Sequence, residues 1–307
     1  MTHTIQSPSA VVMVRPHHFN PNPQTAADNV FQKTANTSLE NIKMMAFAEV
    51  NEAVRILSEH NIDVHVFDDI DTQTPDSVFP NNWFSTHANG SVGVYPMYCE
   101  NRRKEVNTDI VDFLAEKYIV NHLIDYSDYA QQGLYLEGTG AMVLDHENHL
   151  AYAVRSKRMS EAVLQKFCQD FNYQAVVFNA SDENNVPVYH TNVLMCVASK
   201  FAMISLEMIK NQAEKCKVIA HLAKSNKEVI DLTIEQINHF AGNALELSTP
   251  NGNILVLSQT AYFALTKKQI AQLTQYVSIV PINVTTIELA GGSIRCMLAG
   301  IHLAKID

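Results

Sequence analysis

Three side chains that lie far apart in the chain have the chemistry for covalent catalysis: Cys296, His190 and Glu137. A thiolate is a strong nucleophile, an imidazole moves protons near neutral pH, and a carboxylate orients a polar substrate. Each residue alone has an ordinary alternative, because cysteine and histidine are common in cores and glutamate is common in solvated loops. If the fold brings the three together, they predict attack by sulfur on a polar carbon centre.

Amides and glycines accompany these residues in short motifs. An amide both donates and accepts hydrogen bonds, and glycine lets two backbones approach closely. The motifs, in chain order, are Phe79-Pro80-Asn81-Asn82, Glu137-Gly138-Thr139-Gly140, His190-Thr191-Asn192 and Gly291-Gly292-Ser293-Ile294-Arg295-Cys296-Met297. Asn82 alone would be a common turn residue, so its interest comes from the set.

The elements around these motifs repeat with a period of about 50 residues. Corresponding points lie near Gly138, His190, Gly242 and Gly291. Each of the first three is followed by a strand, a turn, a returning strand and a helix, and the fourth unit opens with Val277 to Val284 and reaches Gly291 and Cys296. With a looser unit before residue 130, the chain has about five such units, and units of this kind bury their apolar faces against one another. Closure of the repeats into a ring would bring the equivalent strand starts, and the motifs on them, to one centre.

Two further elements follow from local patterns. Apolar residues recur at helical spacing over Leu39 to Glu59, with Ser38 as the expected N-cap, and Val11 to Pro16 is a β-branched run that predicts a first strand. The apolar run from Met297 to Leu303 predicts a buried strand directly after Cys296.

Composition excludes several classes of function. The 307 residues are 47% hydrophobic, enough for a large core, and the net charge of −10 argues against a nucleic-acid partner. The five cysteines form no CxxC pair, which favours reduced thiols over disulfides or zinc. Residues Met1 to Ser9 lack a secretory pattern, and no apolar run approaches the roughly 20 residues of a membrane helix. We therefore expect a cytoplasmic protein, with homo-oligomerisation left open.

The ordered motifs resemble those of the guanidine-modifying enzymes, the arginine-deiminase and amidinotransferase superfamily. They span residues 79 to 297 in the order of that superfamily, and the terminal Arg295-Cys296-Met297 makes the set specific. The resemblance implies a five-bladed α/β-propeller of ββαβ-type repeats, the pentein fold, in one catalytic domain over residues 1–307. It also implies a small amino-acid substrate and no metal or organic cofactor.

The resemblance further implies the catalytic roles. Cys296 is the nucleophile, His190 the general acid and base, and Glu137 the residue that hydrogen-bonds the substrate nitrogens. Arg158 occupies the place of an arginine that binds the substrate carboxylate, with Arg155 as the alternative. The polar first loop, with Asn20 and Asn29, is expected to close over the pocket.

Two departures from the superfamily pattern bear on the substrate. Deiminases carry aspartates where this chain has Asn82 and Asn192. Neutral amides would attract a buried guanidinium much less than carboxylates do, whereas an amide can pair with both the C=O and the NH2 of a ureido group. We therefore expect a ureido substrate such as citrulline, cleaved through a carbamoyl-thioenzyme to ornithine, ammonia and carbon dioxide, as in the citrulline-utilisation hydrolase branch.

Three alternatives compete with this interpretation. The amides could tolerate a guanidino substrate, which would make the chain an arginine deiminase or a dimethylarginine-type hydrolase. An acceptor amine in place of water would make it an amidinotransferase. A propeller without catalysis could serve as a binding module, which the presence of Cys296, His190 and Glu137 argues against.

Overall fold

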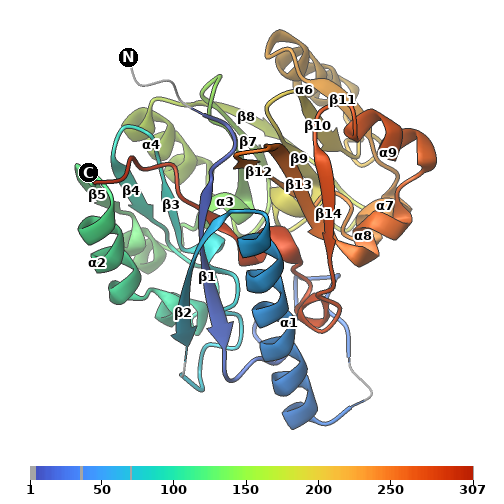
Figure 1. Ribbon diagram of the computed structural model, residues 1–307. Coiled ribbons are helices and arrows are strands. Elements are labelled where there is room, and N and C mark those ends of the chain that lie inside the picture. Colours follow the sequence, from blue (N-terminus) through green and yellow to red (C-terminus); the bar gives the residue numbers. More distant parts are fainter. Residues whose placement is uncertain (1–4, 35–36, 70, 307) are drawn as a thin grey trace.

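The computed structural model describes residues 5–34, 37–69 and 71–306, so the first four residues of the N-terminal segment considered above lie outside the described part. In that part the chain forms five three-stranded sheets arranged around a centre, with the longer helices at the periphery (Figure 1). This arrangement confirms the predicted five-bladed α/β-propeller.

Each sheet has the same internal order from the centre outward. The inner strand pairs antiparallel with the middle strand, and the middle strand pairs parallel with the outer strand. The inner strands are β3 (Phe84–Thr86), β6 (Met142–Asp145), β9 (Met195–Val197), β12 (Leu245–Thr249) and β15 (Ala299–Gly300). The middle strands are β4 (Ser91–Val94), β7 (Leu150–Val154), β10 (Phe201–Ile204), β13 (Gly252–Ser258) and β1 (Ala10–Pro16). The outer strands are β5 (His122–Asp125), β8 (Gln174–Phe178), β11 (Glu228–Asp231), β14 (Ser278–Ile282) and β2 (Asp63–Asp69).

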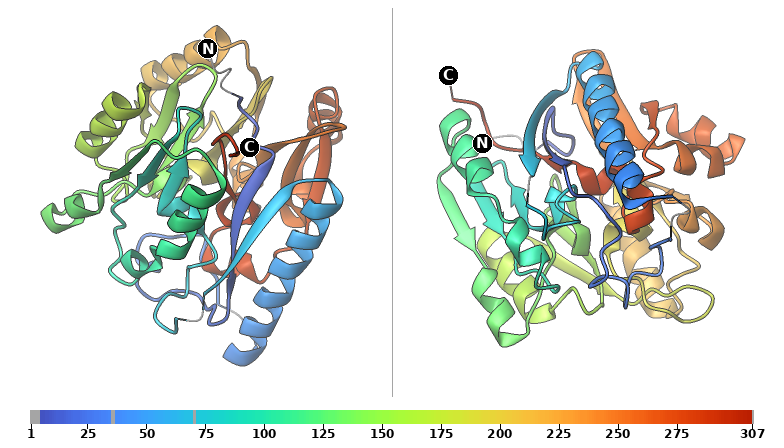
Figure 2. Two further views of the ribbon diagram at one scale, coloured as in Figure 1. Left: turned by 60° about the vertical axis from the view of Figure 1, so that its left-hand side comes forward. Right: turned by 90° about the horizontal axis from the view of Figure 1, so that it is seen from below.

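Helices connect the middle and outer strands, as a parallel pair requires. The connecting helices are α1 (Leu39–Glu59), α2 (Thr108–Lys117), α4 (Glu161–Phe171), α6 (Gln212–Lys224), α8 (Gln259–Ala264) and α9 (Lys267–Leu273). The short turn η2 (Arg102–Glu105) lies with α2 between β4 and β5 of one sheet. Shorter elements between the sheets are α7 (Ile234–Asn238), η3 (Ser127–Gln132) and η4 (Ile287–Ala290). The views in Figure 2 show that the longer connecting helices lie outside the sheets rather than at the centre.

Helix α1 has the predicted bounds and the predicted cap. The Ser38 side chain accepts a hydrogen bond from the backbone N–H of Asn41, and so satisfies one of the free donors at the helix start. Its buried residues recur every three or four positions and pack against β1 and β2. They are Ile42, Ala46, Val50, Ala53 and Leu57. The helix is therefore fixed by a cap and by one apolar stripe.

The prediction of a strand over Met297–Leu303 is wrong in its extent. Cys296 and Met297 belong to a short 3₁₀ turn, η5 (Ile294–Met297), in which the Cys296 N–H bonds to the Ser293 carbonyl, and the strand β15 has only two residues. Most of the run is nevertheless buried. The apolar pattern thus indicated burial rather than extended backbone, because a buried turn and a buried strand are both apolar.

Short helical turns precede four of the inner strands and meet at the centre of the ring. They are η1 (Pro80–Asn82), α3 (Gly138–Ala141), α5 (Thr191–Leu194) and η5. The turns touch one another around the axis, with α3 against both η1 and α5, and η1 against η5. The motifs predicted at strand starts therefore lie on or beside these turns.

Strand β15 completes the ring by joining the two ends of the chain. Val11 and Val12 of β1 pair with Gly300 and Ala299. The sheet that contains β1 thus takes its inner strand from the C-terminal region. This pairing places η5, and with it Cys296, at the centre.

The close approach of neighbouring turns gives a test of the packing at the centre. A Cβ at Gly242 would lie 2.5 Å from the Val193 carbonyl oxygen, which is backbone and cannot move aside. We expect Gly242→Ala to lower the free energy of unfolding by roughly 1–3 kcal/mol or more through overpacking, measured by chemical denaturation. The control is Gly133→Ala, where no atom lies within 4 Å and only the positive φ of 70° carries a penalty. An equal or smaller effect at Gly242 would contradict the packing argument.

Candidate active site

Glu137 lies at the middle of a buried polar network at the centre of the ring. Its Oε2 accepts from Nε2 of His190 at 2.7 Å and from Nη1 of Arg158 at 3.4 Å, and its Oε1 accepts from the Tyr98 N–H at 2.9 Å. Burial by itself would raise the pKa of this fully buried carboxyl, but Arg158, His190 and Arg102 together hold the pKa well below its usual range. Glu137 is therefore anionic, and both of its oxygens are occupied.

His190 sits immediately before α5 and is held by Glu137. Burial lowers the pKa of His190, and the hydrogen bond to Glu137 acts in the opposite direction. The imidazole is consequently neutral at pH 7 and able to accept a proton. Because the carboxylate also fixes the orientation of the ring, this pair resembles the base-and-orienter arrangement of nucleophilic enzymes.

Two amide groups donate hydrogen bonds to the Cys296 sulfur. The Nδ2 atoms of Asn192 and Asn243 each lie 3.3 Å from Sγ. Asn243 also donates to the Asn192 carbonyl and accepts from the Arg295 N–H, so it ties α5 to η5. N–H donors aimed at a buried sulfur stabilise its anionic form relative to the thiol.

Asn82 hydrogen-bonds to Arg102 rather than to the Cys296 sulfur. Its Oδ1 accepts from Nη1 of Arg102 at 3.0 Å, and the same guanidinium binds both oxygens of Glu105 at 2.8 Å. Nε of Arg102 also lies 3.8 Å from Asp76, whose Oδ1 has no hydrogen-bond partner among the described residues. Asp76 lines the pocket beside Cys296, and burial raises its pKa.

The glycines of the second motif allow the turns to pack. Gly138 has a φ of +43°, and a Cβ there would lie 2.6 Å from the Asn81 carbonyl oxygen. At Gly140 a Cβ would lie 2.2 Å from Nδ2 of Asn82 and 2.8 Å from Nδ1 of His190. Side chains at either place would displace the functional groups.

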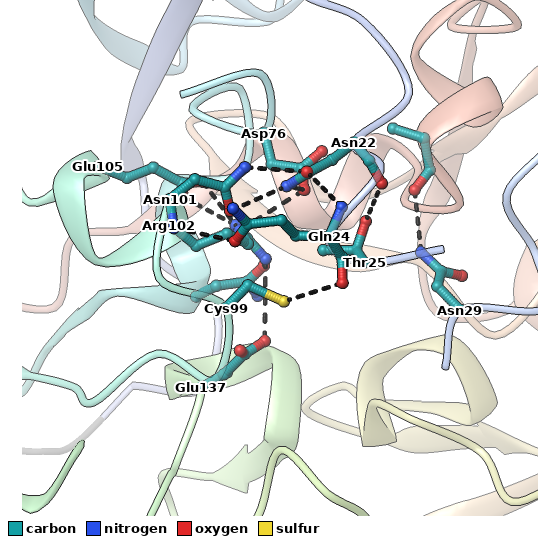
Figure 3. Close-up of polar contacts among 12 residues, drawn as sticks. Asn22, Gln24, Thr25, Asn29, Asp76, Cys99, Asn101, Arg102, Glu105 and Glu137 are labelled. Carbon is teal, nitrogen blue, oxygen red and sulfur yellow. Dashed lines mark hydrogen bonds and ion pairs between the residues drawn. The ribbon is translucent and has the colours of Figure 1, made fainter. Parts of the chain in front are cut away.

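The first loop lines the pocket through Asn29, one of the two residues named in the sequence, but not through Asn20. Thr25 and Asn29 line the pocket, and Asn29 donates to the Ala290 carbonyl at 2.9 Å. Figure 3 shows the loop residues beside Cys99, Arg102 and Glu137. Asn20 does not line the pocket, because its amide is turned back to the His18 carbonyl. The pocket beneath the loop has a free volume of about 10 Å³, close to that of one water molecule, so a substrate requires the loop to move.

Arg158 lies in the pocket and Arg155 does not. Asp28 of the first loop accepts from Nε of Arg158 at 2.9 Å and from its Nη2 at 2.6 Å, as a substrate carboxylate could. Arg155 is partly exposed and pairs with Glu161 and Glu214. The structure thus places the predicted arginine in the site and the alternative outside it.

Four residues of the site were not singled out in the sequence: Asp28, Asp76, Arg102 and Asn243. Asn243 follows Gly242, a point of the 50-residue repeat, so its position in the repeat could have marked it. The other three come from loops and from η2. No periodic pattern marks those positions.

In residues 5–34, 37–69 and 71–306, no group of three or more His, Cys, Asp and Glu side chains is arranged to hold a metal ion. All five cysteines fall in these ranges and are unpaired thiols. None of the helices in the same ranges combines the length and the apolar content needed to cross a bilayer.

The fold and the buried Cys–His–Glu arrangement define the class: a guanidino-modifying enzyme of the five-bladed propeller type. A family model described as N,N dimethylarginine dimethylhydrolase, eukaryotic, matches residues 15–303. The chain belongs to this family, and it is a hydrolase acting on carbon–nitrogen bonds other than peptide bonds. No curated protein matches the chain.

Solved structures with the same fold are distant in sequence. The N-terminal domain of ArgZ bound to substrate, an arginine dihydrolase from the ornithine–ammonia cycle in Cyanobacteria, is 15% identical, with a TM-score of 0.73 over 95% of this chain and 97% of that one. AgrE with L-arginine is 16% identical, with a TM-score of 0.75 over 97% of this chain. This chain spans only 41% of that AgrE chain. A dimethylarginine dimethylaminohydrolase adduct is 12% identical, with a TM-score of 0.64 over 97% and 99% of the two chains.

The contact between Asn243 and Cys296 can be tested by replacing the amide with a carboxylate of the same shape. In Asn243→Asp a negative charge would replace an N–H donor beside the sulfur, so we expect iodoacetamide to alkylate Cys296 roughly tenfold more slowly. The rate is measured by quenching and peptide mass spectrometry. Cys216 is exposed and serves as the internal control, with an unchanged rate. An unaltered rate at Cys296 would show that the amide does not stabilise the thiolate.

Proposed function

We propose that the chain hydrolyses a ureido amino acid such as citrulline, with Cys296 as the nucleophile and His190 as the acid and base. Because the oxygens of Glu137 are occupied, we assign it to orienting His190 rather than to the expected role of hydrogen-bonding the substrate nitrogens. The products are ornithine, ammonia and carbon dioxide. The observation that carries the proposal is that the hydrogen-bond donors to the sulfur are neutral amides rather than carboxylates. Among the described residues, the side chains that hydrogen-bond to Sγ are those of Asn192 and Asn243.

The negative charge of Glu137 does not make the pocket more favourable for a cationic substrate. Arg158 and Arg102 lie 3.4 Å and 3.8 Å from its Oε2, and His190 and Tyr98 occupy its remaining acceptor sites. A guanidinium at the reacting position would meet a carboxylate that is already offset by two cations. A neutral ureido group requires no uncommitted negative charge there.

Asn192 also has a free acceptor for such a group. Its Nδ2 is directed to the sulfur, while its buried Oδ1 has no partner among the described residues. A buried acceptor without a partner is costly, and the NH2 of a ureido group would satisfy it. This contact would place the ureido carbon beside Sγ.

The outer part of the pocket suits the charged end of an amino acid. Arg158 would bind the α-carboxylate when Asp28 moves away with the loop, since Asp28 occupies the same donors in the closed structure. The free Oδ1 of Asp76 would accept from the α-ammonium group. Asp76 thus supplies, in the same pocket as Cys296, the carboxylate that the motif positions lack.

The reaction balances with one water molecule. Neutral His190 takes the Cys296 proton, and the thiolate attacks the ureido carbon. The bond from that carbon to the ornithine side-chain nitrogen breaks, and His190 returns the proton to this nitrogen. Water, deprotonated by His190, then attacks the carbamoyl thioester, the C–S bond breaks, and the released carbamate decomposes to ammonia and carbon dioxide.

Arginine is the second candidate substrate. The unpartnered Oδ1 of Asp76 favours a cationic group in the pocket, and the fold neighbours ArgZ and AgrE are described with arginine as a ligand or substrate. These neighbours are too distant to carry a substrate over on their own. Direct comparison of the two substrates decides between the candidates.

Turnover of citrulline and of arginine can be compared directly. Purified protein should release ornithine and ammonia from citrulline with a higher kcat/KM than from arginine, because the sulfur has neutral neighbours. Ornithine and ammonia are measured in steady state on both substrates, with Cys296→Ala as the inactive control. Faster turnover of arginine would overturn the ureido proposal, and activity in Cys296→Ala would overturn the assignment of the nucleophile.

The preference for citrulline over arginine should change when residue 192 carries a negative charge. Asn192→Asp places a carboxylate where a cationic guanidinium would pair with it, so the ratio of kcat/KM for arginine to that for citrulline should rise about tenfold or more. The matched control is Asn283→Asp, an exposed residue away from the pocket, which should leave the ratio unchanged. If the ratio stays constant in Asn192→Asp, residue 192 does not determine the choice between the two substrates, even if citrulline is turned over.

A further inference from the structure

A second cavity lies in the channel along the axis of the ring. It is lined by residues of all five inner strands, which lead away from the turns that carry the active site. Among the described residues, none lines both this cavity and the pocket at Cys296. The channel cavity is therefore a separate compartment behind the catalytic turns.

The guanidinium of Arg295 in this cavity has no carboxylate partner in the part of the chain that the structure describes. Its one side-chain hydrogen bond goes from Nη1 to the Leu298 carbonyl at 3.0 Å. Arg102 and Arg158, which are buried, differ from it because each pairs with carboxylates. Arg295 is only partly buried, but a cation withdrawn from water without a counter-ion is still costly, so its remaining donors favour an anion.

The other polar side chains that line the cavity are neutral amide, hydroxyl, thiol and imidazole groups. His146 and His302 stack with centroids 3.8 Å apart, and no described Asp or Glu lines the cavity. Burial lowers the pKa of both imidazoles, that of His302 to about 4, and Arg295 lowers them further. The protein itself thus provides positive potential here and no negative charge to balance it.

The size of the cavity limits the ligand. Its free volume is about 40 Å³, and one water molecule needs roughly 10–15 Å³ by the same measure. Three or four non-hydrogen atoms fit, whereas an amino acid or a nucleotide does not. A guanidinium binds two oxygens of a planar oxyanion in one plane through paired N–H donors.

We propose that the channel cavity is a binding site for a small planar oxyanion of the bicarbonate type, held by the guanidinium of Arg295 and bounded by His146, His302 and Gln6. The site is distinct from the catalytic pocket. It does not depend on which substrate that pocket accepts.

The test is a thermal-shift titration of the full chain with bicarbonate and, separately, with nitrate, which has the same planar shape and does not titrate. Ionic strength is held constant with gluconate, which is too large for the cavity. We expect a saturable rise in Tm with both planar anions, because ligand binding to the folded state stabilises it. Arg295→Met should abolish the rise.

Further variants show where the anion binds and keep the test decisive if one variant does not fold. Arg295→Lys keeps the charge but loses the planar fork, so it should weaken binding roughly tenfold, and it decides the question if Arg295→Met does not fold. Arg158→Met removes a guanidinium from the catalytic pocket and should leave the titration unchanged. The proposal is overturned if no saturable shift occurs, or if the shift survives in both Arg295 variants or disappears in Arg158→Met.

Discussion

The buried negative charge of Glu137 is the constraint on which the arrangement of the site depends. A carboxylate without water is costly unless cations and N–H donors surround it, and here Arg158 and Arg102 supply the cations. Each guanidinium is itself tied down by another carboxylate, Arg158 by Asp28 of the first loop and Arg102 by Glu105 of η2. The charge at the centre therefore determines how the loop above it is held.

Much of the fold could be predicted because its signals are local and repeated. The stripe and cap of α1 gave its bounds, and the recurring units indicated the number of sheets. The short turns at the centre could not be predicted in this way, since four residues carry no period. The error at Met297–Leu303 has the same cause: a buried turn and a buried strand both appear as apolar residues.

The candidate site was partly predictable for a related reason. Glu137, His190 and Cys296 stand in motifs, and the structure brings His190 within 2.7 Å of Glu137 and Asn192 within 3.3 Å of Cys296. Asp76 could not be found, because it comes from an irregular segment and becomes notable only when its free oxygen is seen in the pocket. The motif positions supply only neutral amides to the pocket. Asp76 adds a carboxylate that those positions do not indicate.

The pairing of β15 with β1 has a consequence for how the enzyme is made. Cys296 lies on the turn just before β15, so in a chain synthesised from its N-terminus the proposed nucleophile emerges after every other residue of the candidate site. The thiol acquires its amide neighbours only when this segment pairs with β1 as the inner strand of that sheet. The surroundings of the sulfur are therefore complete only once the ring has closed.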